Sequence, residues 1–151
     1  MAGRTTENQG HLAARTTEYA IDKMEQLLAL KFCDEQADTR VFPAAANGGT
    51  GLAIGGNSNP ATAPVALYVD YLDADGSLLA SVGVTAPAGW YYSRVWQVSY
   101  VIDPGIPCPF PNPPPPTSAL KQITVTAIVA RSPGVTIVPQ STVTALKTSP
   151  F

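Results

Sequence analysis

Residues Thr5–Lys31 read TTENQGHLAARTTEYAIDKMEQLLALK, and this is the one long segment of the chain with helical periodicity. Two apolar stripes run along such a helix, and the polar residues take the opposite face. The first stripe contains Ala13, Ala20, Ile21, Met24, Leu27 and Leu28, and the second contains Leu12, Tyr19 and Leu30. This apolar arc is wider than one covered sheet requires. It indicates either a well-covered core helix or a helix whose second stripe, Leu12, Tyr19 and Leu30, also meets another subunit.

The rest of the chain reads as loop and strand. A Gly-rich loop over 43–64 leads to a β domain over 65–147, with strands expected at 65–72, 77–84, 90–103 and 120–130. Weaker edge strands are expected at 135–138 and 142–147. The pattern predicts an α+β fold in which one long N-terminal amphipathic helix, 5–31, packs on an antiparallel sheet of about four to five strands. Residues 1–4 are interpreted as an expression remnant, and 5–151 as a single domain.

Composition limits the classes of function. The chain has 151 residues, with 9 Lys+Arg against 11 Asp+Glu and a net charge of −2. No basic field points to nucleic acid or to an anionic membrane surface. Low charge with many Thr, Val, Gly and Pro residues is typical of extracellular β-rich proteins.

The two cysteines, Cys33 and Cys108, allow one pairing. Neither belongs to a CxxC motif, and no second pair completes a zinc site. We interpret them as a structural disulfide that ties the helix end to the β domain, with two separate buried thiols as the alternative. A disulfide implies an oxidising compartment such as the periplasm or the cell surface.

Chemistry-bearing motifs are sparse. The only histidine, His11, lies on the polar helix face without a GxSxG motif, and the Gly-rich loop lacks the Lys-Ser/Thr of a phosphate loop. Asp73 and Asp75 in DADG are read as a hairpin turn, with calcium as the weaker alternative because no third carboxylate follows. Arg94 beside Trp96 is compatible with cation stacking, although a structural role is favoured. We therefore expect no catalytic residues, no cofactor and no enzyme activity.

The order of several motifs resembles the type IV pilin-like proteins, specifically minor pilins of the PilV kind. The helix carries Ala20, Lys23, Met24, Glu25, Leu27 and Leu28 in the spacing of the pilin helix end. YVDYLDADGS, the strand with Tyr92, Arg94 and Trp96, and LKQITVTAIVA follow in order. The resemblance spans roughly residues 17–131.

This resemblance implies a structural subunit, a minor pilin or pseudopilin, that lacks its N-terminal membrane helix. Its implied partners are other pilin subunits, with no nucleic acid, and its implied location is a surface pilus or the periplasm, with inner-membrane anchoring before assembly. A type IV pilus and a type II secretion pseudopilus both fit. The alternative function is an extracellular adhesin or carbohydrate-binding module that uses Trp90, Tyr91 and Tyr92 as exposed aromatics.

Overall fold

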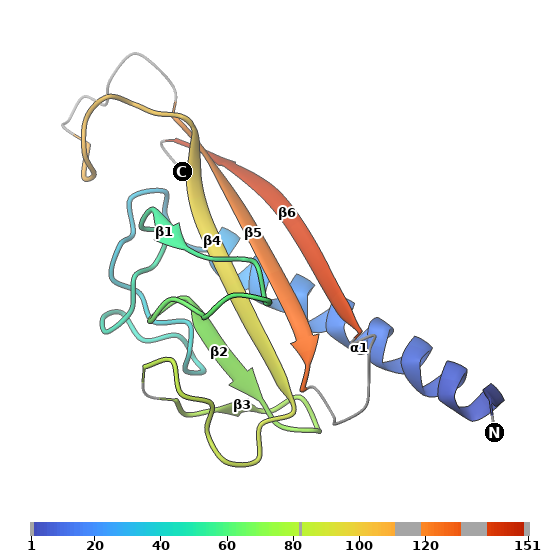
Figure 1. Ribbon diagram of the computed structural model, residues 1–151. Helices are drawn as coiled ribbons and strands as arrows, with labels where there is room; N and C mark the ends of the chain where they lie inside the picture. The colour runs from blue at the N-terminus through green and yellow to red at the C-terminus, as the bar shows by residue number, and fades with distance from the viewer. Residues whose placement is uncertain (1, 82, 111–118, 131–138, 150–151) are drawn as a thin grey trace.

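The computed structural model describes residues 2–81, 83–110, 119–130 and 139–149, with side chains described from His11 onward. One helix, α1 (Ala2–Leu28), lies behind the sheet, and its N-terminal turns project past the last strand (Figure 1). The helix ends where the amide of Leu30 turns to the carbonyl of Leu27. The ammonium of Lys147 then binds the carbonyl of Leu28, which satisfies one of the orphan acceptors of the helix end.

Within the described residues, six antiparallel strands form one sheet in the order β3-β2-β4-β5-β6, with β1 paired to β4. Their bounds are β1 Gly55–Gly56, β2 Val69–Leu72, β3 Leu78–Leu79, β4 Tyr92–Ile102, β5 Leu120–Val129 and β6 Gln140–Thr148. The two short strands β1 and β2 share one edge of β4, because β5 occupies the other edge along nearly its whole length. The three long strands, β4, β5 and β6, are drawn side by side in Figure 1.

The predicted architecture, a long helix packed on four to five strands, is wrong. Strand structure predominates, the sheet has six strands, and the part of α1 whose side chains are described is short, from His11 to Leu28. The helix also ends three residues before the predicted 31. Local pattern missed β1, which is only two residues long and too short to show a period. It also made β3 too long, because the strand expected at 77–84 covers only Leu78–Leu79.

Strand boundaries differ from the prediction for local reasons. The segment expected to begin a strand at residue 65 first makes a turn, in which the amide of Tyr68 donates to the carbonyl of Val65. The strand expected at 142–147 is the longer β6, and the one expected at 135–138 lies outside the described residues. The antiparallel pairing of β4 with β5 agrees with the prediction.

The core lies between α1 and one face of the sheet. Alternate side chains of β4 and β5 point toward the helix, as period-two strands require. The buried apolar residues of this core are Tyr19, Ala20, Met24, Leu27, Leu52, Tyr68, Leu72, Tyr92, Trp96, Val98, Ile123, Val125, Ala127 and Val129. A smaller cluster of Val69, Tyr71 and Val95 with Trp90 lies on the opposite face. Within the described part of the chain, no helix is long and apolar enough to cross a membrane.

Candidate functional site

Three charged side chains from different elements meet in the core. Lys23 comes from α1, Asp70 from β2 and Arg94 from β4, and the sheet register places Asp70 directly opposite Arg94. The Asp70 carboxylate accepts from Lys23 Nζ at 2.7 Å, from Arg94 Nε at 2.7 Å and from Arg94 Nη2 at 3.0 Å. All three residues are buried. We call this set the ionic cluster.

Neutral acceptors complete the cluster, whose two cations outnumber its one anion. Lys23 Nζ also donates to the carbonyl of Thr39 at 2.9 Å and to its hydroxyl at 2.7 Å. Arg94 Nη1 donates to the carbonyl of Tyr19 at 3.3 Å. The ammonium of Lys23 lies 4.1 Å from the centre of the Trp96 ring, whose negative face attracts a cation. It is therefore Lys23, and not Arg94, that occupies the position over Trp96.

The environment shifts the ionisation of the cluster. Burial lowers the pKa of Lys23 from 10.5 to about 8, although the negative charge of Asp70 acts in the opposite direction. Burial alone would raise the pKa of Asp70, but the positive charges of Arg94 and Lys23 outweigh it and hold this pKa below its ordinary value. At neutral pH the cluster thus contains an ionised carboxylate and two cations.

The members of the ionic cluster are bound mainly to one another. The three ammonium protons of Lys23 match its three acceptors, and both oxygens of Asp70 are occupied by Lys23 and Arg94. The arrangement locks α1, the Thr39 loop, β2 and β4 together and is structural in its chemistry.

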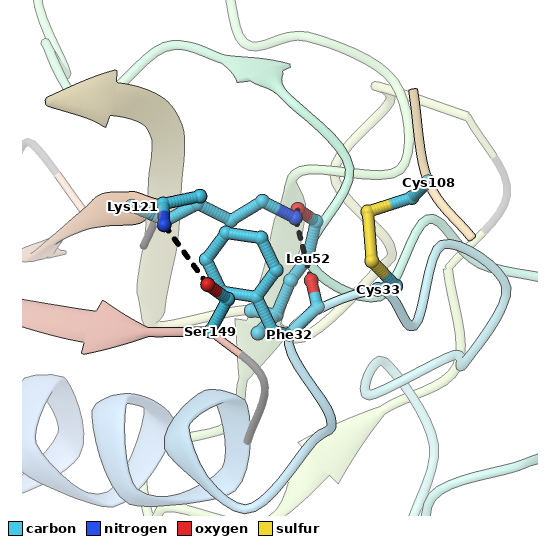
Figure 2. The surroundings of a disulfide bond; sticks show 7 residues. Phe32, Cys33, Leu52, Cys108, Lys121 and Ser149 are labelled. Atoms are coloured by element: carbon cyan, nitrogen blue, oxygen red, sulfur yellow. Dashed lines mark hydrogen bonds between the residues drawn. A yellow bond between two sulfur atoms is a disulfide. The ribbon is translucent and has the colours of Figure 1, made fainter. Parts of the chain in front are cut away.

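A second buried cation lies at the other end of the core, near the disulfide (Figure 2). Lys121 of β5 donates to the carbonyls of Phe32 at 2.6 Å and Leu52 at 2.8 Å, and its ammonium lies 4.4 Å from the centre of the Phe32 ring. Burial lowers the pKa of Lys121. The next residue after Phe32 is Cys33, so the disulfide and this ammonium fix the same chain segment from two sides.

A cleft of about 810 Å³ opens beside the ionic cluster, between α1, the loop at 40–42 and the β2–β3 hairpin. Its wall includes Asp22, Glu25 and Phe42, together with Arg40 and Arg94. Arg94 is bound to the Asp70 carboxylate, and Arg40 pairs with Asp38 at 2.9 Å. Both guanidinium groups of the cleft are thus already paired with a carboxylate of the protein.

The structure contains the disulfide expected between Cys33 and Cys108, which are separated by 75 residues. Asp73 and Asp75 lie in a turn, as expected for the hairpin, where Asp73 Oδ1 accepts from the amides of Asp75 and Ser77. Over the ranges the structure describes, no group of three or more His, Cys, Asp or Glu residues is placed to hold a metal ion.

The aromatic and apolar candidates lie mostly inward. Tyr92 is buried in the core, contrary to the exposed position expected for it, and Trp90 packs edge-on against Tyr71. Tyr91 is 36% exposed. Of the second helical stripe, Tyr19 is buried, and Leu12 and Leu30 are partly buried and pack on the core. Contact of this stripe with another subunit stays a prediction.

Sequence reasoning missed the roles of Lys23, Asp70 and Lys121, although the positions of Lys23 and Lys121 each carried a signal. Lys23 follows the core residue Ala20 by three positions, which places a charge on the buried helix face. Lys121 precedes Ile123 by two positions, on the buried face of β5. A charge that occupies a core position in an apolar period indicates a buried, partnered ion.

Comparison of the chain with protein-family models, with curated proteins and with solved structures finds no match in any of the three.

Proposed function

We propose that the protein is a structural subunit of a type IV pilus or a related secretion filament, of the minor-pilin or pseudopilin type. It acts through protein–protein contacts, in filament assembly or at the tip. It works at the cell surface or in the periplasm, where its disulfide is stable. The proposal rests on the sequence motifs and on the chemistry of the core, and not on a pilin-like architecture.

One observation carries the proposal. The motifs that resemble the pilin series supply one member each to the ionic cluster: Lys23 from the helix motif, Asp70 from YVDYL and Arg94 from the Tyr-x-Arg-x-Trp strand. This buried cluster joins α1 to β2 and β4 through hydrogen bonds among its own members, so its physical role is to hold α1 on the sheet. Because these motif residues stabilise the fold, they favour a protein that functions through contacts made by its surface.

The experiment is a filament co-purification from the parent cells. An epitope tag is placed after Phe151 of the chromosomal copy, surface filaments are sheared off, and the tag is followed by blotting and by immunogold labelling. The proposal predicts the tag in the sheared fraction and gold particles on filaments. The same tag on an unrelated periplasmic protein controls for leakage.

Absence of the tagged protein from the sheared filaments would overturn the proposal. This outcome requires that the cells make filaments, that the tagged protein is present and folded, and that the sheared fraction lacks it. An aromatic sugar-binding role is not favoured, because Tyr92 lies in the core and Trp90 packs on Tyr71.

A further inference from the structure

In the part of the chain that the structure describes, the long strand β6 lies at the edge of the sheet and has a row of backbone hydrogen-bonding groups that no other strand pairs. At its two ends, the amide of Val129 donates to the carbonyl of Pro139, and the amide of Ser149 donates to the carbonyl of Ala119. Hydrogen-bonded and non-hydrogen-bonded residue pairs alternate in an antiparallel ladder. The backbone amides and carbonyls of the odd-numbered residues of β6 therefore bond to β5. The amides and carbonyls that point to the open edge belong to Gln140, Thr142, Thr144, Leu146 and Thr148.

Among the described residues, the edge carries none of the usual devices that stop strands from pairing. The strand has no proline, and its register with β5 is regular from end to end. Its one charged residue, Lys147, is turned toward the helix, where its ammonium binds the carbonyl of Leu28 at 2.9 Å. The outward face instead presents threonines and Leu146, which is 57% exposed.

One flank of α1 lies beside this edge. The hydroxyl of Thr17 bonds to that of Ser141 on β6 at 2.7 Å, which places this flank on the β6 side. Ile21 follows Thr17 by one turn on the same flank and is 43% exposed, although the sequence pattern placed it in the core stripe. Thr17 and the exposed Ile21 therefore lie on the flank of α1 that is nearest to β6.

We propose that β6 pairs with β6 of a second copy of this chain, antiparallel about a two-fold axis through Thr144. This register sets Gln140 opposite Thr148, Thr142 opposite Leu146, and Thr144 opposite its own copy. In this register each even-numbered residue lies opposite another even-numbered residue. All of the amides and carbonyls that point outward from both strands then find partners. Lys147 lies opposite Ser141, so no like charges meet.

A second copy fits this surface better than an open chain of copies would. The other end of the sheet is β3, which is only two residues long and cannot extend the ladder in the same way. Pairing is therefore self-complementary and closed, as in a two-fold dimer. The axis is normal to the sheet, so the two helices lie on the same face and Ile21 of each faces the other protomer.

The test is the mass of the purified protein in solution, by sedimentation equilibrium at concentrations up to about 100 µM, in the range of a weak dimer. The wild-type chain is expected to approach twice 15.8 kDa. Thr144→Lys places two ammonium groups opposite each other on the axis and should raise the dimer Kd by about tenfold or more. Thr124→Lys is the matched control, because Thr124 is the register partner of Thr144 one strand further in.

The helix flank gives an independent pair of variants. Ile21→Lys should raise the dimer Kd, whereas Asp22→Lys, on the exposed side that lines the cleft, should leave it unchanged. Hydrogen exchange of the wild-type protein needs no variant: the Thr142, Thr144 and Leu146 amides should become protected as concentration rises. A monomer throughout, a dimer that tolerates Thr144→Lys, or outward amides that exchange equally fast at all concentrations would each overturn the proposal.

Discussion

Replacing Asp70 with asparagine should cost the fold about 3–5 kcal/mol, because it leaves two buried cations without their counter-charge. The carboxylate accepts three charge-assisted hydrogen bonds, two from Arg94 and one from Lys23, all at 3.0 Å or less. An amide keeps the shape but offers one acceptor oxygen and no charge. A loss of this size would remove a large share of the roughly 5–15 kcal/mol by which a domain is stable.

The assay is urea unfolding followed by tryptophan fluorescence with the disulfide intact, which gives the free energy of unfolding for each variant. Asp22→Asn is the control, since Asp22 is exposed and should change this free energy by less than about 0.5 kcal/mol. Adding Lys23→Met to Asp70→Asn should recover part of the loss, because one stranded cation is removed. A loss below about 1 kcal/mol for Asp70→Asn, or a double variant in which the two losses simply add, would refute this account of the cluster.

Three further predictions concern charge, cross-link and turn. The pKa of Lys23 is lowered from 10.5 to about 8, so the unfolded chain holds more protons than the folded one between these values. The free energy of unfolding should therefore rise, on the order of 1–2 kcal/mol, from pH 8 to about 9.5, and Lys23→Met should lack this rise in urea titrations at each pH. Replacing Cys33 and Cys108 with serine opens a 75-residue loop and should cost about 4 kcal/mol in the same assay. Reduced wild-type protein should match that variant, and an unchanged midpoint would contradict the entropic argument. Gly76→Ala should lower the free energy of unfolding by more than about 1 kcal/mol. Gly76 has a φ of +85°, and the new methyl group would lie 2.5 Å from the phenolic oxygen of Tyr19 on α1. Gly83→Ala, at a φ of +65° with open space around it, should show a smaller loss in thermal unfolding and serves as its control.

Local pattern predicted the parts of this fold whose signal is contained in a few consecutive residues. The aromatic and β-branched residues from Tyr92 to Val98 predicted β4, but they did not predict which face of the strand is buried. The Gly76 turn predicted the β2–β3 hairpin. In these places the side-chain period and the backbone freedom of one glycine are sufficient causes.

The sequence pattern did not predict how elements far apart in the chain are placed relative to one another. The two-residue strand β1 exists only because β4 offers it an edge, so it has no side-chain period of its own. The strand expected at 77–84 is reduced to the two residues of β3. Ile21 matched the apolar stripe but lies 43% exposed, because the helix is rotated so that Thr16 and Lys23 take core positions. Helical period alone does not fix that rotation.

The sequence by itself determined that a helix precedes long antiparallel strands and that two cysteines are available to cross-link them. Tertiary structure alone decided which charges share the interior. Asp70 meets Lys23 across 47 residues of chain and Arg94 across 24, and only that meeting makes the burial of each tolerable. The physical reason is that propensity and periodicity act between neighbours, whereas the cost of burying a charge depends on partners that folding alone brings near.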